Sequence, residues 1–235
     1  MQSSKPSADT FFRFKQNSRP FYDLQGEALA QFDGMGMEIS YMRGGQLFAE
    51  GEQPKYVFIV CSGRVKLSVS SREGKTMILR IAEAGQVLGL SVALSSTEHE
   101  MTAEAIEPCR VKAIRVNDFL TFLRDYPEAA MDATRSVLRE YQVLFNDVCR
   151  LALPGTIAGR LANLLLDWLR THSQTGHADR RFTMALTHEE IAGMTGTSRE
   201  TVSRVLSRFE RQKLICIKGA SLTVLQPEAL AQLAT

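Results

Sequence analysis

The order of apolar and polar positions divides the chain into a segment of short strands and a longer helical segment after it. From about Glu38 to about Val116, short apolar runs are separated by glycine-containing turns, which is typical of a β-sandwich or a small barrel. A short helix is expected just before this segment, over Gln25 to Phe32. We therefore predict an α+β chain whose β domain spans residues 21–126, after a polar stretch, residues 1–20, that is expected to be disordered or loosely docked.

Three runs show the strand pattern most clearly. The first is continuously apolar and ends at Ser62-Gly63, the second alternates, and the third precedes Ala84-Gly85. In chain order they are Tyr56 to Cys61; Val65, Leu67 and Val69; and Met77, Ile78, Leu79 and Ile81.

A long helix is expected after the β domain, over residues 127–152, because Pro127 suits a first helical turn and heptad spacing follows it. One apolar stripe has the spacing of a coiled-coil seam and consists of Val137, Tyr141, Leu144, Val148 and Leu151. A second stripe repeats every seven residues and consists of Met131, Leu138, Phe145 and Ala152. Two adjacent stripes favour a helix that packs one face on the β domain and the other face on a second copy of the chain. The alternative is a single broad stripe that packs only against the core.

The remaining residues, 153–235, are predicted to form a second domain. Leu153-Pro154-Gly155 interrupts the helix and provides a hinge. An apolar helix follows over Ile157 to Leu169, then a polar loop over residues 171–180 and a short strand over Phe182 to Leu186. Pro227 is placed to open a last short helix.

The stretch from Leu186 to Leu225 shows the pattern of a winged helix-turn-helix. Thr187 and Glu190 have the spacing of a capping box in front of a helix over His188 to Thr195, and Gly196 can take the positive φ that ends it. Ser198 is placed to cap a second helix whose inward positions are Val202, Val205, Leu206 and Phe209. Leu214 to Ile217 and Leu222 to Leu225 then form a hairpin, the wing, around a glycine-containing turn.

The outward side of the second helix suits the edges of bases in a major groove. Arginine can donate to guanine, glutamate can accept from cytosine, and serine can do either. The predicted base-reading residues are Arg199, Glu200, Ser203 and Arg204. Thr187, Ser198, Thr201 and Lys218 are the expected contacts to the DNA backbone. The alternative is an ordinary surface helix with a charged face.

Charge is distributed in agreement with this interpretation. The net charge of +2 is small, but residues 153–235 contain 10 Lys and Arg against 7 Asp and Glu, while residues 1–152 contain 18 against 19. Basic residues therefore concentrate where DNA would be met. No run approaches the length of a membrane span and no signal-peptide core is present, so a cytoplasmic protein without a membrane partner is expected.

The segment SRETVSR, with the preceding EEIAGMTG and the following LSRFERQKLI, closely resembles the DNA-binding module of the cyclic AMP receptor protein/fumarate and nitrate reductase regulator (CRP/FNR) family. The β segment resembles the sensory jelly roll of the same family, with glycines at the expected turns between Gly45 and Gly63 and between Gly85 and Gly89. The resemblance implies a homodimeric bacterial transcription regulator that binds double-stranded DNA and RNA polymerase. It also implies an inverted repeat with TGTGA-like or TTGA-like half-sites about 34 Å apart, the spacing known for helix-turn-helix dimers, a founding member of this family among them.

The sensory segment departs from the pattern of the family members that bind a cyclic nucleotide. Those members use a Gly-Glu pair and an Arg-Ser or Arg-Thr pair, whereas here Leu90 follows Gly89 and Met101 precedes Thr102. Both charged contacts are missing, so cyclic AMP is not expected in that mode. Gly89, Leu90, Met101 and Thr102 are the candidate effector-pocket residues. With Val92 and Leu94 they suit an uncharged or apolar ligand, or none.

The positions of the cysteines and histidines indicate which kinds of redox or gas sensor are expected. An iron-sulfur cluster is not expected, because the four cysteines, Cys61, Cys109, Cys149 and Cys216, are dispersed. They are expected to be free, mostly buried packing thiols, and a thiol sensor is the alternative. Haem stays open through His99, Met101 and Cys109.

Two other classes of protein fit the sequence less well than a transcription regulator. A metal-dependent enzyme on the β domain is not expected, because only His99 of the four histidines lies near that domain. A ligand-binding module without DNA binding is the weaker third class, since its nucleotide signature is missing while the winged module is intact.

Overall fold

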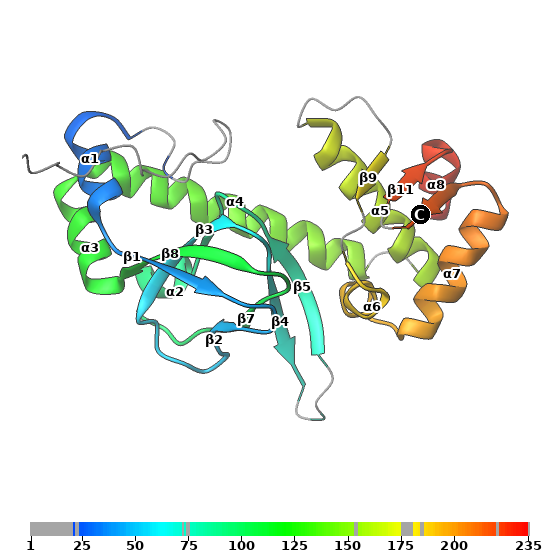
Figure 1. Ribbon diagram of the computed structural model, residues 1–235, viewed down its shortest axis with the longest axis horizontal. Coiled ribbons are helices and arrows are strands. Elements are labelled where there is room, and N and C mark those ends of the chain that lie inside the picture. The colour runs from blue at the N-terminus through cyan, green and yellow to red at the C-terminus, as the bar shows by residue number, and fades with distance from the viewer. Residues whose placement is uncertain are drawn as a thin grey trace, which may run out of the picture. The chain divides into compact units, whose positions relative to one another are not determined.

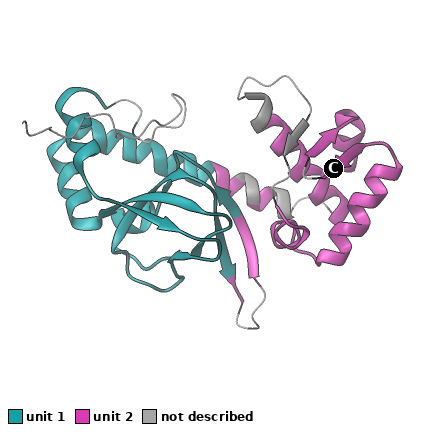
Figure 2. Ribbon diagram, viewed as in Figure 1, with its two compact units in different colours: residues 1–69, 80–142 teal, residues 70–79, 143–235 magenta. Residues whose placement is uncertain are grey.

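The computed structural model describes residues 21, 24–71, 73, 76–152, 155–174, 181–183, 186–219 and 221–234, so the expectation for residues 1–20 lies outside the described part. The chain forms two compact units (Figure 2). The first unit comprises residues 1–69 and 80–142, and the second comprises residues 70–79 and 143–235. Within the described residues, every helix is too short or too polar to span a lipid bilayer.

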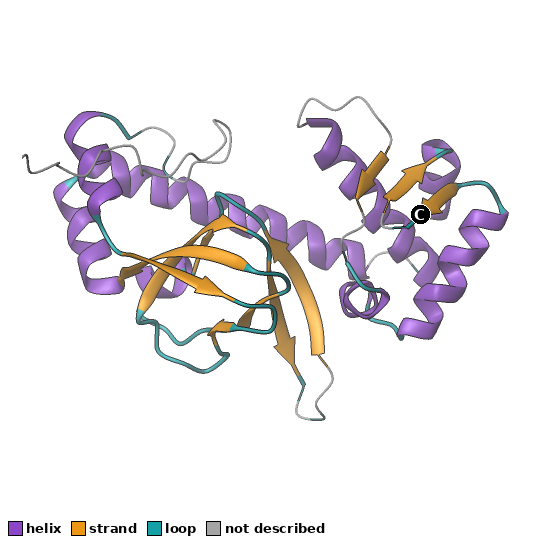
Figure 3. Ribbon diagram, viewed as in Figure 1, coloured by secondary structure: helices purple, strands orange, loops and turns teal. Residues whose placement is uncertain are grey.

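The predicted β domain is confirmed as two four-stranded antiparallel sheets (Figures 1 and 3). One sheet has the order β1-β8-β3-β6, built from β1 (Met37–Tyr41), β8 (Cys109–Arg115), β3 (Tyr56–Ser62) and β6 (Val87–Leu88). The other has the order β2-β7-β4-β5, built from β2 (Gln46–Phe48), β7 (Thr102–Ala105), β4 (Val65–Ser70) and β5 (Thr76–Ala82).

The position of strand β3 between two hydrophobic cores explains why its sequence is apolar without alternation. Phe58 and Val60 belong to the core that also contains residues of β4 and β7 from the other sheet. Val57 and Ile59 belong to a second core, which packs the outer face of the sheet against helices. Because both faces of the strand are buried from Val57 to Val60, every position of that stretch is apolar.

Four helices cover that outer face of the first sheet: α1 (Gly26–Gly34), α2 (Leu90–Ser95), α3 (Val116–Asp125) and the first half of α4 (Pro127–Ala152). The expected helices before and after the β domain are confirmed, and α4 has the predicted bounds. Helix α2 was not predicted, because its six residues are too few for helical periodicity to be recognised.

Strand β5 corrects the expectation for its apolar run. Ile78, Arg80 and Ala82 are the buried positions, while Met77 is exposed and Leu79 and Ile81 are half-buried. A strand alternates between its two faces, but apolar residues at successive positions on both sides of Arg80 concealed that this charged residue points inward.

The residues of the two predicted apolar stripes of the long helix α4 differ in exposure. Val137, expected in the seam, packs against the helical core of the first unit. The exposed apolar face instead consists of Met131, Leu138, Tyr141, Phe145 and Val148, each 55–64% exposed. Leu144 is half-buried, and the side chains of Leu151 and Ala152 lie outside the described part. The exposed apolar face therefore combines members of both predicted stripes and leaves out Val137.

The second unit contains α5 (Ile157–Gln174), α6 (His188–Thr195), α7 (Arg199–Arg211) and α8 (Pro227–Leu233), with a three-stranded sheet. Helix α5 continues five residues beyond the predicted end at Leu169, so residues 171–174 of the expected loop are helical, and residues 175–180 lie outside the described part. The sheet has the order β10-β11-β9, from β10 (Ile215–Lys218), β11 (Ser221–Val224) and β9 (Arg181–Thr183). Of the proposed hinge, residues 153 and 154 lie outside the described part.

Candidate nucleic-acid interface and effector pocket

The turn between α6 and α7 is fixed by local hydrogen bonds, as the sequence predicts. The Thr187 hydroxyl accepts from the Glu190 amide at 3.2 Å, and a Glu190 carboxylate oxygen accepts from the Thr187 amide at 2.6 Å, which completes the capping box. Gly196 ends α6 with φ 61°, a left-handed conformation that is sterically unfavourable for residues with a Cβ atom. The Ser198 hydroxyl accepts from the Thr201 amide at 3.3 Å and begins α7.

Helix α7 has one buried face and one exposed face. Val202, Val205, Leu206 and Phe209 are buried, as predicted. Three predicted base-reading residues, Arg199, Glu200 and Arg204, are exposed. The fourth, Ser203, is half-buried, and its hydroxyl shares a 2.8 Å hydrogen bond with Nδ1 of His188 on α6. This histidine was not predicted to touch the recognition surface, since it lies fifteen positions away in the sequence.

Glu200 is ionised at the amino-terminal end of α7. Its pKa is lowered by a hydrogen bond from its own backbone amide, by one from the Ser198 side chain and by nearby Arg199. A carboxylate is favoured at this end of a helix, where backbone N–H groups lack intrahelical partners. The glutamate at this position therefore stabilises the helix. Its exposed carboxylate can also accept a hydrogen bond from a base.

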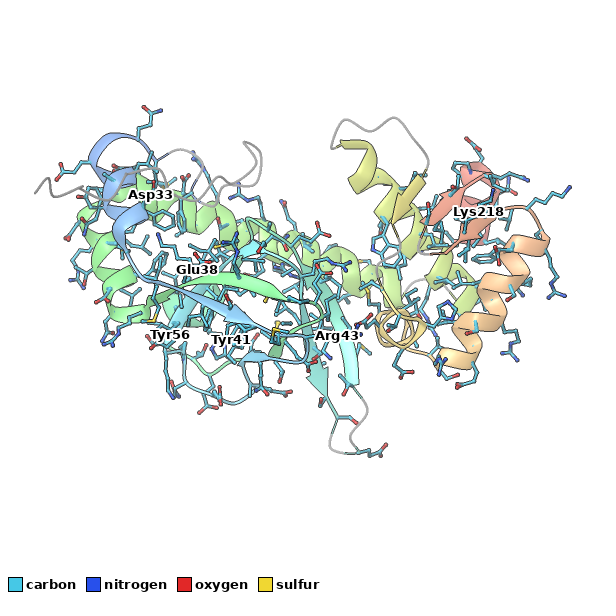
Figure 4. All side chains as sticks on the ribbon, in the orientation of Figure 1. Asp33, Glu38, Tyr41, Arg43, Tyr56 and Lys218 are labelled. Carbon is cyan, nitrogen blue, oxygen red and sulfur yellow. The ribbon has the colours of Figure 1, made fainter. Side chains whose placement is uncertain are left out.

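The wing follows α7 directly and has the predicted hairpin form. Lys218 pairs with Ser221 across the hairpin, next to Gly219 with φ 60°, and the exposed Lys218 side chain lies at this end of the strand (Figure 4). A Glu210 carboxylate oxygen accepts from the Ile217 amide at 2.9 Å, which fastens the wing to α7. Of the other expected backbone contacts, Thr187 and Ser198 are exposed and Thr201 is half-buried.

A small pocket lies in the first unit, within the jelly roll and beside α4. Its apolar lining includes Phe48, Leu67, Leu88 and Val92. Two of the predicted pocket residues, Gly89 and Met101, line it. Leu90 belongs instead to the helical core, Leu94 is 42% exposed, and the Thr102 hydroxyl accepts from the Glu50 amide at 3.1 Å.

Polar side chains that were not among the predicted pocket residues also line this pocket. His99 lines it and is buried, with its ring stacked on Phe48 at a centroid distance of 3.8 Å. Glu100 and Glu140 line it as well. Glu140 lies on α4, far from the pocket segment in the sequence, so only the tertiary fold could reveal it.

The burial of the cysteines differs in part from the expectation that most of them are buried. Cys109 is buried, whereas Cys61, Cys149 and Cys216 are half-buried. Burial raises the pKa of both the Cys61 and the Cys109 thiols, so neither is an activated thiolate near neutral pH.

Comparison with known proteins agrees with this architecture. Residues 38–126 match the cyclic nucleotide-binding domain family, and residues 159–233 match the Crp-like helix-turn-helix domain family. The chain is 27% identical over 212 residues to the CRP-like cAMP-activated global transcriptional regulator of Mycobacterium tuberculosis (strain ATCC 25618 / H37Rv), which covers 90% of this chain and 94% of that relative. It is 27% identical over 217 residues to the fumarate and nitrate reduction regulatory protein of Escherichia coli (strain K12), covering 91% and 85%.

Among solved structures, FixK2 from Bradyrhizobium japonicum has the same fold, with a TM-score of 0.75 at 22% identity over 86% of this chain and 98% of that one. The relatives are transcriptional regulators, and the chain is a DNA-binding transcription regulator rather than an enzyme. On the two matched domains and these relatives, the chain belongs to the CRP/FNR family of transcriptional regulators.

Proposed function

We propose that the protein is a homodimer that reads an inverted repeat with TGTGA-like or TTGA-like half-sites. The observation that supports this most is the capped α6–α7 pair, which presents Arg199, Glu200 and Arg204 on the exposed face of a helix whose other face is buried. Serine at position 203 favours the TTGA-like half-site of the fumarate and nitrate branch. RNA polymerase is the proposed protein partner.

Pairing of two chains is proposed to occur along α4. Its exposed apolar side chains lie at positions 138, 141, 145 and 148, the alternating spacing of a coiled-coil seam. Large apolar side chains arranged this way favour burial against a second copy. Two recognition helices would then enter successive major grooves.

Control is proposed to come from an effector other than cyclic AMP or an iron-sulfur cluster. A signal in the jelly roll would change the register of the paired α4 helices, and residues 153–155 would convert that change into the spacing of the recognition helices. Regulation requires that the signal binds the two states with different affinities. A haem or thiol signal is the alternative; the raised pKa values of Cys61 and Cys109 disfavour thiol chemistry at those two positions.

The test of DNA reading is a fluorescence anisotropy titration of duplexes with two half-sites, over a range of salt concentrations. Lys218→Ala should weaken binding by the same factor on cognate and scrambled duplexes and make the salt slope shallower by about two, about one for each subunit of the dimer, because a phosphate contact releases a counterion without reading sequence. Arg124→Ala, at an exposed position of α3 in the first unit, is the control and should change neither quantity. A loss confined to the cognate duplex, or an unchanged salt slope, would contradict the role of Lys218.

A further inference from the structure

The hydrogen bond between His188 and Ser203 joins the first residue of α6 to a residue of α7 that is expected to read bases. Nδ1 of His188 and the Ser203 hydroxyl oxygen lie 2.8 Å apart, and both side chains are half-buried. Glu200 and Arg204, which are exposed neighbours of Ser203 on the same helix, are further candidates for contacts to bases. His188 therefore contacts the recognition surface itself, from the other helix of the pair.

Both partners of this bond are held in place by the fold. His188 follows the capping residue Thr187, whose hydroxyl accepts from the Glu190 amide at 3.2 Å and whose amide donates to the Glu190 carboxylate at 2.6 Å. Ser203 follows Val202, whose side chain is completely buried. Because the backbone is fixed at both ends, little further ordering is needed to hold the two side chains together.

The Ser203 hydroxyl differs from most hydroxyls inside a helix. Such a hydroxyl commonly bonds back to a carbonyl of the preceding turn, as the Thr195 hydroxyl does by donating to the Ile191 carbonyl at 2.8 Å. Within the described part of the chain, the bond to His188 is the only hydrogen bond of the Ser203 hydroxyl. The imidazole, and not its own helix, therefore orients this hydroxyl.

The orientation of the hydroxyl decides which base edge it suits. A serine hydroxyl has one donor and two acceptor positions, so a freely rotating hydroxyl can meet either kind of group. When Ser203 donates to Nδ1, its oxygen is left to accept from the amino group of adenine or cytosine. When Nδ1–H donates to Ser203, the hydroxyl proton points away from the ring and can meet an acceptor on guanine or thymine.

We propose that His188 is a positioning residue for DNA reading, which fixes the direction of the Ser203 hydroxyl and so sets the base preference at one position of each half-site. Because it requires α7 to lie in the major groove, this role rests on the proposed function. A contact from His188 to phosphate would instead raise the affinity for all sequences alike. A bond that only ties the two helices together would change stability and leave base preference as it is.

The test is a double-mutant cycle on the full-length protein, measured by fluorescence anisotropy with duplexes that carry each single base change in one half-site. Ser203→Ala identifies the base pair that the serine reads. His188→Ala should lower discrimination at the same pair by about 3- to 10-fold, as expected for the net effect of one hydrogen bond. It should leave the affinity for scrambled duplexes and the salt slope unchanged. In the Ser203→Ala background, His188→Ala should have no further effect, because the two residues act as a unit.

Two conservative variants separate positioning of the hydroxyl from helix stability. His188→Asn carries its polar atoms on Cγ, as the imidazole carries Nδ1, and should restore most of the discrimination that His188→Ala loses. His188→Gln carries its polar atoms one bond farther out and is the matched control, which should discriminate no better than His188→Ala. Thermal unfolding of each variant should show that it is folded at the temperature of the titration.

Several results would overturn the proposal. They are an unchanged base preference in Ser203→Ala or His188→Ala, equal losses by His188→Ala on cognate and scrambled duplexes, additive losses in the cycle, and better discrimination by His188→Gln than by His188→Asn. If the wild type still prefers its cognate duplex in such a case, the proposed function stands and only the role of His188 is contradicted. A wild type without any sequence preference would contradict both.

Discussion

Glutamate at both Leu138 and Val148 is expected to convert the protein to monomers and to lower its affinity for a duplex with two half-sites by about 10²- to 10⁴-fold. Both side chains are nearly three-fifths exposed and lie on the exposed apolar face of α4. Like charges on facing helices oppose pairing, and the second half-site then no longer gains from being bound by a linked copy. Sedimentation velocity and anisotropy titration measure the two effects.

The control for this variant is Arg139→Glu, which places a glutamate at an exposed position of the same helix outside the apolar face. It should remain dimeric and bind DNA like the wild type. Circular dichroism must show that the double variant keeps its helices, so that lost pairing is distinguished from unfolding. A double variant that stays dimeric would show that the chains pair through another surface.

Replacing Glu200 by alanine is expected to lower discrimination at one G·C pair by about tenfold or more, since a base-edge contact contributes about 1–3 kcal/mol to discrimination. Affinity for scrambled duplexes should fall little, because the removed group is negative and makes no favourable contact with phosphates. Anisotropy titration against duplexes with each single base change in one half-site identifies the position.

Glu228→Ala is a closely matched control for that experiment. Glu228 is the second residue of α8, as Glu200 is of α7, and both are exposed acidic residues in the first turn of a helix in the second unit. The control reports the cost of losing a carboxylate at a helix amino terminus without a base contact. Equal losses by Glu200→Ala on cognate and scrambled duplexes would assign this residue to helix formation alone.

The helix-turn-helix could be predicted almost to the residue because its signals are local. The capping box, the glycine in the left-handed region and the serine cap each connect residues only three or four positions apart. The predicted bounds of α6, His188 to Thr195, are those observed. The contact between His188 and Ser203 was missed because it depends on how two helices cross.

The sensory unit was harder to predict because its chemistry is assembled from distant segments. Alternation along β5 places Arg80 inside, but the apolar residues before and after it occupy both faces and do not show which face is buried. Likewise, the two stripes of α4 are equivalent in spacing, and only packing against the helical core separates half-buried Val137 from exposed Leu138. The pocket combines His99 with Glu140 by the same kind of long-range packing.

Two copies of the chain are proposed to read one inverted repeat. Selection of bound duplexes from a random pool by the purified protein, followed by sequencing, tests this proposal. We expect enrichment of inverted repeats with TTGA-like or TGTGA-like half-sites whose centres lie about one helical turn apart. Enrichment of single, unpaired half-sites, or of no sequence at all, would contradict it.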